Sequence, residues 1–234
     1  MYKTTSILIL TAIAAMILSI FGLRGETDIA IVNYLFEKRN IATLNILFFV
    51  TLLASSGTAL ITILSVAVSS LVRKYTDTAI AAVSGFFATE LAMLSLKQIF
   101  QRSRPDIAFR AISENSFSFP SGHATTAAFV FGFLAYLIFL GTKNTTTRVA
   151  TLSSVIVMTI AVDLSRVYLG VHYTSDVIAG NLLGFLVLLL TIALHTRWRK
   201  QHTIIGESHS RTVIISISLC IMTATLWFLF GSTP

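Results

Sequence analysis

Residues Leu44–Val72 read LNILFFVTLLASSGTALITILSVAVSSLV, a stretch without a single Asp, Glu, Lys or Arg. About 18 or more consecutive apolar residues are enough to cross a bilayer as a helix, so this stretch predicts a membrane span. The composition agrees, because 55% of the 234 residues are hydrophobic and only 12% are charged. A soluble domain carries about 25% charged residues. The sequence therefore argues against a soluble fold and indicates an integral membrane protein.

Further apolar stretches lie on both sides of this one. The predicted spans are, in order, Thr4–Leu23, Leu44–Val72, Thr78–Leu96, Ala124–Gly141, Val149–Val167, Val177–Leu194 and Thr212–Gly231. We therefore predict an all-α integral membrane protein, a helical bundle with a six-span core and a seventh, C-terminal span. The first apolar run follows Lys3 and is longer than the hydrophobic region of a signal peptide, so we expect a retained anchor.

The chain divides into three segments. Residues 1–43 form the first anchor and an interfacial loop, 44–194 a core that carries the motifs described below, and 195–234 a basic loop and the extra span. Within Asp28–Thr43, apolar residues recur at near-helical spacing. This segment is either a helix lying in the membrane interface or a partly ordered loop.

The net charge of +7 reflects basic residues in short loops, where they set membrane orientation. If the spans alternate in direction, nine Lys and Arg residues lie on the N-terminal side of the membrane and eight on the other side. The second number falls to five when Lys97, Arg104 and Arg166 are assigned to a functional site and left out of the count. This comparison predicts a cytoplasmic N-terminus and an outward-facing loop after the third span. No basic run is long enough to indicate nucleic-acid binding.

Most chemically reactive side chains fall at span ends on that outward side. They are Lys97 and Arg104 after the third span, Ser121, Gly122 and His123 before the fourth, Arg166 at the end of the fifth, and His172 and Asp176 before the sixth. Three cations at one membrane face indicate an anion of concentrated charge, such as a phosphomonoester. The Pro120-Ser121-Gly122 turn opens a helix whose first amides can add to such a phosphate site.

The two histidines supply reactivity. His172 and Asp176 are four residues apart, so they can share a face and form a hydrogen bond. A carboxylate that holds one ring N–H fixes the tautomer and leaves the other nitrogen free to attack phosphorus. His123 comes from a different helix and can act as general acid, then as general base.

These residues resemble the three-part signature of the type 2 phosphatidic-acid phosphatase superfamily. Lys97-(six residues)-Arg104-Pro105 is followed by Pro120-Ser121-Gly122-His123 and by Ser165-Arg166-(five residues)-His172-(three residues)-Asp176. The resemblance covers roughly Leu44–Leu194 and implies a metal-independent lipid phosphatase that works through a phosphohistidine, without a cofactor.

It implies that His172 is the nucleophile, Asp176 its partner and His123 the acid/base. Lys97, Arg104, Ser121, Gly122 and Arg166 would bind the phosphate. Bacterial members of this kind act on undecaprenyl diphosphate, phosphatidylglycerol phosphate or phosphatidic acid. We accordingly expect a lipid-phosphate substrate and a site on the extracytoplasmic face of the bacterial cytoplasmic membrane.

Two other classes of function stay open. A phosphohistidine can also pass its phosphate to a lipid hydroxyl, which would make the protein a phosphotransferase. A transporter without enzymatic activity is the more distant alternative, since transport sites usually place polar residues near the midplane. A zinc site is disfavoured because the sequence has no HExxH motif, no usable thiol and no third convergent histidine.

Three polar residues have competing interpretations. Glu90 lies within the third span, where it either aligns the helix end near Lys97 or forms a hydrogen bond within the bundle. Asp163 is three residues before Arg166, and we expect it to hold that guanidinium. His195 lies on the opposite side from the motifs and is expected to be exposed to solvent.

Overall fold

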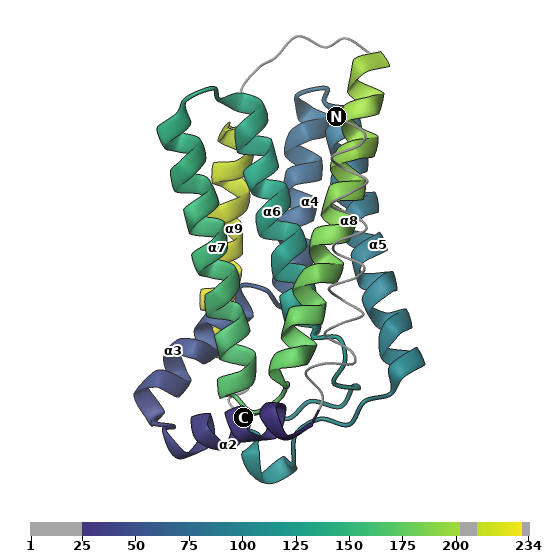
Figure 1. Cartoon of the computed structure of the whole chain (residues 1–234). Coiled ribbons are helices and arrows are strands. Elements are labelled where there is room, and N and C mark those ends of the chain that lie inside the picture. Colours follow the sequence, from purple (N-terminus) through teal and green to yellow (C-terminus); the bar gives the residue numbers. More distant parts are fainter. Residues whose placement is uncertain (1–24, 202–209, 231–234) are drawn as a thin grey trace.

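A computed structural model describes residues 25–201 and 210–230, with side chains for 25–199 and 216–229. Throughout these residues the regular secondary structure is helical, so the predicted all-α fold is confirmed (Figure 1). The helices are α2 (Glu26–Glu37), α3 (Ile41–Leu52), α4 (Ser56–Val72), α5 (Thr76–Phe100), α6 (Gly122–Gly141), α7 (Thr145–Tyr168), α8 (Thr174–Gln201) and α9 (Ser210–Phe230), with a short 3-10 helix, η1 (Ile107–Phe109), between α5 and α6.

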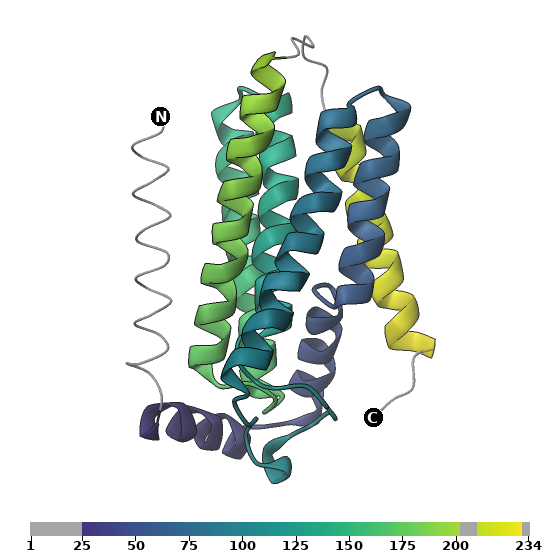
Figure 2. The same ribbon diagram turned by 90° about the vertical axis from the view of Figure 1, so that its right-hand side faces the viewer.

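The long helices α4 to α9 form an upright bundle in which α6 contacts α4, α5, α7, α8 and α9. At one end α2 lies across the bundle, beside the connection from α5 to α6 that contains η1 (Figures 1 and 2). The predicted segment Asp28–Thr43 is thus a helix followed by the start of α3, and not a loop.

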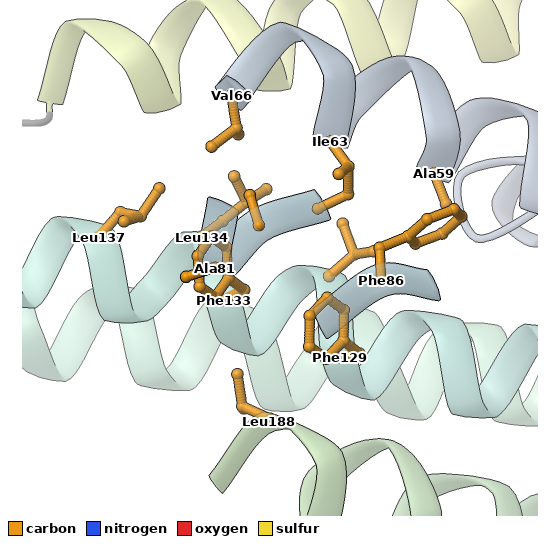
Figure 3. Close-up of a cluster of buried hydrophobic side chains, with 12 residues drawn as sticks. Ala59, Ile63, Val66, Ala81, Phe86, Phe129, Phe133, Leu134, Leu137 and Leu188 are labelled. Carbon is orange, nitrogen blue, oxygen red and sulfur yellow. The ribbon is translucent and has the colours of Figure 1, made fainter. Parts of the chain in front are cut away.

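The main hydrophobic core lies between α4, α5, α6 and α8 (Figure 3). Phe129 and Phe133 of α6 stack with their ring centroids 5.9 Å apart, and Phe86 of α5 joins them in the core. Ile63 and Leu188 close the cluster from α4 and α8. This core holds the helices that carry the motif residues in fixed register.

Helices α6 and α8 approach closely because α8 presents glycines to its neighbour. A Cβ at Gly180 would lie 2.6 Å from the carbonyl oxygen of Ser121, and one at Gly184 would lie 2.2 Å from that of Thr125. Small residues allow membrane helices to pack backbone against backbone. The contact packs the first turn of α6 against the second and third turns of α8, directly beside the motif residues at the start of both helices.

Four described helices, α5, α6, α7 and α8, are each long and apolar enough to cross a membrane, and the bent pair α3 and α4 could make a fifth span. The predicted span Leu44–Val72 differs from a single helix. It bends by 40° between α3 and α4, where the Ser55 hydroxyl accepts a hydrogen bond from the Thr58 amide and starts a new helix. Together with the similarity reported below, these helices make the chain an integral membrane protein.

The two terminal predictions have different outcomes. Thr4–Leu23 lies outside the described residues, and Thr212–Gly231 largely coincides with α9. The count of seven spans therefore stays a prediction.

The expectation for His195 is wrong, because the residue is only 2% exposed. Its ring contacts the Asp77 carboxylate and the Tyr136 hydroxyl across three helices, α8, α5 and α6, and these partners replace water.

Candidate active site

The motif residues converge at the α2 end of the bundle. They come from the end of α5, the α5–α6 loop, the first turn of α6, the last turn of α7, the α7–α8 turn and the first turn of α8 (Figures 1 and 2). Gly170 makes the α7–α8 turn possible. It has a φ of +70°, and a Cβ there would lie 1.9 Å from the carbonyl oxygen of Phe109. The turn delivers His172 into the protein interior, where it is 1% exposed.

The His172 ring is held through its Nδ1 atom. Nδ1 lies 3.5 Å from Oδ2 of Asp176 and 3.4 Å from the hydroxyl of Ser118, which itself donates to Asp176 at 2.5 Å. On the other side, Nη1 of Arg104 lies 3.0 Å from Nε2 of His172. A guanidinium has no acceptor, so Nε2 must be the unprotonated nitrogen and Nδ1 must carry the proton.

Burial lowers the pKa of His172 to about 3, with Arg104 and Arg166 adding to the effect and Asp176 opposing it. The imidazole is therefore neutral at physiological pH. Its Nε2 lone pair points toward a cationic surface. This is the form of histidine that can attack an electrophilic phosphorus.

The guanidinium groups of Arg104 and Arg166 are joined by a carboxylate that the motif analysis did not include. Glu114, in the α5–α6 loop, accepts from Nη2 of Arg166 at 2.5 Å and from Nη2 of Arg104 at 3.4 Å. Burial would raise the pKa of Glu114, but Arg166 and Arg104 outweigh it and lower the pKa below its ordinary value. The carboxylate thus occupies the position between two arginines that a bound anion would take.

The predicted pair of Asp163 with Arg166 is wrong. Asp163 instead accepts a hydrogen bond from the Asn181 amide of α8 at 2.6 Å. Arg166 is 1% exposed and donates from Nη1 to the Thr51 hydroxyl at 2.9 Å, while its Nε atom is buried without a partner in the described part of the chain. The acidic partner of Arg166 is thus Glu114 from the α5–α6 loop, and not a residue of its own helix.

The other predicted phosphate ligands border the same space. Lys97 is 5% exposed and its ammonium donates to the Phe117 carbonyl. Ser121 starts α6, and its hydroxyl is buried without a partner among the described residues. Gly122 opens the helix, where the first amide groups lack partners within the helix.

His123 follows in the first turn of α6. Its electrostatic neighbours are Arg166, His172, Arg104 and Lys97. The structure therefore brings all eight predicted site residues to one end of the bundle. Their roles stay predictions.

A pocket of about 520 Å³ opens beside this cluster. Its lining includes Leu94, Lys97, Arg104, Arg110 and Glu114. Burial lowers the pKa of Arg104 to about 10, so its guanidinium remains cationic at neutral pH. The pocket is polar at the motif residues and has an apolar side chain of α5 in its wall, which suits an amphiphile with an anionic headgroup.

Sequence reasoning missed five polar residues that contact the motif side chains: Thr51, Arg102, Glu114, Ser116 and Ser118. Arg102 and Glu114 could have been suspected as charges within a long loop that is otherwise rich in motif residues. The other three carry no signal in the sequence, because their partners are distant along the chain.

Glu90 is hydrogen-bonded within the bundle. Its carboxylate accepts from the Thr126 hydroxyl of α6 at 2.9 Å and from the Ser56 hydroxyl of α4 at 3.3 Å. Of the two interpretations, the structure supports a hydrogen bond between helices. Glu90 thus links α5 to the helices that flank it.

The fold and this cluster define a class of protein: an integral membrane helical bundle with a buried, cation-lined histidine site at one end. The chain belongs to the PAP2 superfamily, whose family model matches residues 58–200. That match contains all eight predicted site residues.

Individual relatives are similar over shorter stretches. The chain is 42% identical over 100 residues to phosphatidylglycerophosphatase B of Bacillus subtilis, covering 41% of this chain and 47% of the relative. It is 34% identical over 118 residues to decaprenylphosphoryl-5-phosphoribose phosphatase of Mycobacterium tuberculosis, covering 49% of this chain and 59% of the relative. The matched part of the chain thus spans about half the length of these relatives.

A solved structure matches over more of its length. It is the crystal structure of a transmembrane PAP2-type phosphatidylglycerolphosphate phosphatase from Bacillus subtilis. The TM-score is 0.71 at 28% identity, over 84% of this chain and 98% of that one.

Proposed function

We propose that the chain is a membrane lipid phosphatase that hydrolyses a terminal phosphate from a lipid phosphate or diphosphate. The observation that carries the proposal is the 3.0 Å contact between Nε2 of His172 and the Arg104 guanidinium in a buried, cation-rich site, because a guanidinium can pair only with an unprotonated ring nitrogen. The names of the relatives, all phosphatases of lipid-linked substrates, support the same class of reaction.

In the first half-reaction the substrate phosphate replaces Glu114 as the acceptor for Arg104 and Arg166. Arg104 then releases Nε2 of His172, whose lone pair attacks phosphorus. A P–N bond forms, the bond from phosphorus to the lipid oxygen breaks, and its electron pair stays on that oxygen. His123 donates a proton to the leaving oxygen, which departs as the lipid alcohol or lipid phosphate.

In the second half-reaction a water molecule gives a proton to His123 and attacks phosphorus. The P–N bond breaks, its electron pair returns to Nε2, and inorganic phosphate leaves. Asp176 keeps the proton of His172 on Nδ1 throughout and stabilises the positive charge that the ring gains on phosphorylation. Lys97, Arg104 and Arg166 offset the negative charge on the phosphate oxygens, and this electrostatic effect is the largest in phosphoryl transfer.

The substrate class follows from the position of the site. It lies at the end of a bundle whose α7 exposes Val149, Ile156, Val157 and Leu164, so an acyl or prenyl chain can stay in the bilayer beside the helices. Phosphatidylglycerol phosphate, phosphatidic acid and undecaprenyl diphosphate all present a terminal phosphate on such a chain. We place the site on the extracytoplasmic face, following the distribution of basic loop residues.

Trapping the intermediate tests this proposal. Purified protein is mixed with phosphatidic acid that carries a labelled phosphate and is quenched in alkali, where a phosphohistidine survives. We expect label on His172 in wild type and none in His172→Ala, and turnover that persists in EDTA. Label on a different residue, or strict loss of turnover with EDTA, would contradict the proposal. Label that ends on a second lipid instead of free phosphate would identify a phosphotransferase.

A further inference from the structure

Arg102 forms a buried cluster beside the proposed catalytic pair that phosphate binding does not use. Its Nη1 atom donates to Oδ1 of Asp176 at 2.6 Å and to the Ser175 hydroxyl at 2.6 Å, and its Nη2 atom donates to Oδ2 of Asp28 at 2.8 Å. The guanidinium also lies 4.3 Å from the centre of the Tyr173 ring. Both terminal nitrogens of Arg102 are thus engaged in hydrogen bonds to carboxylates, and Nη1 also binds a hydroxyl.

Asp28 connects this cluster to α2. Its side chain is 2% exposed, and its Oδ1 atom accepts from the Ser175 amide at 3.1 Å in the first turn of α8. Its Oδ2 atom accepts from the Ser175 hydroxyl as well. A carboxylate at a helix N-terminus satisfies an amide that has no partner within the helix and favours the helix dipole. Asp28 therefore fixes the start of the helix that carries Asp176.

Charge explains why the cluster needs an arginine. Asp28 and Asp176 are both almost fully buried, and a buried carboxylate is costly unless it is paired and hydrogen-bonded. The planar fork of Arg102 reaches both carboxylates at once, which a lysine ammonium cannot do with the same geometry. The side chain of Arg102 is 14% exposed, so solvent screens the pairs only weakly.

We propose that Arg102 and Asp28 are positioning residues for the reaction: Arg102 holds the Asp176 carboxylate against His172, and Asp28 anchors Arg102 to α2. The inference rests on the proposed function, because it assigns Asp176 to His172. Neither residue contacts the phosphate in this scheme. Both act through Asp176.

The charged groups around His172 determine how a substitution at Arg102 or Asp28 changes the protonation of its ring. They are Asp176 from α8, Arg104 and Glu114 from the α5–α6 loop, Arg166 from α7 and His123 from α6, with Lys97 of α5 facing Asp176. Replacing Arg102 by Gln leaves the charge of Asp176 less compensated. That charge then favours protonated His172 more strongly. The acid limb of the pH–activity profile, where activity falls as His172 becomes protonated, therefore moves to higher pH. Replacing Asp28 by Asn lets Arg102 compensate Asp176 alone, and the limb moves the opposite way.

The experiment compares Arg102→Gln, Arg102→Lys and Asp28→Asn with wild type as full-length protein in detergent, using dioctanoyl phosphatidic acid as probe. We expect Arg102→Gln to lower kcat by about 10- to 100-fold, because misplacing a reacting group by a fraction of an ångström is enough for such a loss. Arg102 lines the pocket, but its terminal nitrogens donate to Ser175, Asp176 and Asp28, so KM should change by less than about threefold. Arg102→Lys should recover only part of kcat, and Asp28→Asn should lose less than Arg102→Gln.

Matched controls are Glu26→Gln, an exposed acid on α2, and Arg148→Gln at the opposite end of α7. Both should keep wild-type kcat. A wild-type kcat and acid limb in Arg102→Gln, or a loss explained fully by unfolding with an unmoved limb, would overturn the proposal. If Arg102→Gln does not fold, the proposal is tested by Asp28→Asn alone: a shift of the acid limb to lower pH supports it, and an unmoved or opposite shift overturns it.

A histidine NMR titration separates this proposal from the proposed function. The protonation of His172 can be followed without turnover, so opposite shifts in Arg102→Gln and Asp28→Asn support positioning even in a protein that releases no phosphate. Wild-type turnover with unshifted His172 titration in both variants would leave the function standing and remove the positioning role.

Discussion

The described part of the chain contains two histidine–aspartate pairs with buried imidazoles, one at each end of the bundle. At the α2 end, Nδ1 of His172 lies 3.5 Å from Oδ2 of Asp176. At the opposite end, Nε2 of His195 lies 3.1 Å from Oδ2 of Asp77. Both imidazoles are almost fully buried, and both aspartates lie in the first turn of a helix.

The pairs differ at the second ring nitrogen. Nδ1 of His195 is 2.7 Å from the Tyr136 hydroxyl, and the Thr78 hydroxyl lies 3.3 Å from Nε2, so both nitrogens have partners that hold helices together. Among the described residues, Nε2 of His172 is in hydrogen-bond range of Arg104, and in the proposed mechanism Arg104 leaves it to bind the substrate phosphate. We therefore expect a buried His–Asp pair to be structural when both ring nitrogens have fixed partners, and to be reactive when cations that can bind phosphate surround the second nitrogen.

The largest expected effect comes from removing the two imidazoles separately. His172→Ala should reduce turnover of dioctanoyl phosphatidic acid by about 10⁴-fold or more, as loss of a catalytic nucleophile does in other enzymes. His195→Ala, measured per folded protein, should keep turnover within about threefold of wild type, because its pair contacts no substrate. Comparable losses in both variants would show that the comparison is wrong.

Much of the reactive pair could be predicted from the sequence, and little of its surroundings. The spacing of His172 and Asp176 and the span ends place the motif residues on one face, because topology alone brings alternate span ends together. Glu114 and Arg102 could not be placed that way. They lie in a 20-residue loop from Gln101 to Pro120, whose path depends on tertiary contacts such as that between Ser118 and Asp176.

The same reasoning explains the errors. Asp163 is near Arg166 in sequence, but the side chain meets Asn181 of a neighbouring helix, so helical spacing selected the wrong partner. His195 follows a hydrophobic run and precedes basic residues, a pattern typical of an exposed loop. Helix α8 continues to Gln201, which carries His195 inside the bundle. Side chains whose partners lie on other helices carry no local signal.

A smaller effect is expected at Glu114, which has no counterpart in the His195 pair. Glu114→Gln removes the anion that competes with phosphate for Arg104 and Arg166, so orthophosphate should inhibit at about tenfold lower concentration. The measurement is the inhibition constant of orthophosphate in wild type and variant. Asp106→Asn, in the same loop, is the matched control, because Asp106 caps η1 and contacts neither arginine. An unchanged constant in Glu114→Gln would show that its carboxylate does not compete for the anion position.

The smallest effect on turnover, and a clear effect on stability, is expected at the His195 pair. His195→Phe keeps an aromatic ring among α5, α6 and α8 but removes the hydrogen bonds to the Tyr136 hydroxyl and to the Asp77 carboxylate, which retains Arg199 at 3.9 Å. Each lost hydrogen bond costs about 0.5–1.5 kcal/mol, so thermal unfolding in detergent should occur at a lower temperature. Tyr136→Phe removes only the hydroxyl and should cost less, and the double variant should cost less than the sum because the two residues share one hydrogen bond. A His195→Phe protein with wild-type stability would mean that the ring contributes only packing, and the two histidine–aspartate pairs would then differ in strength as well as in chemistry.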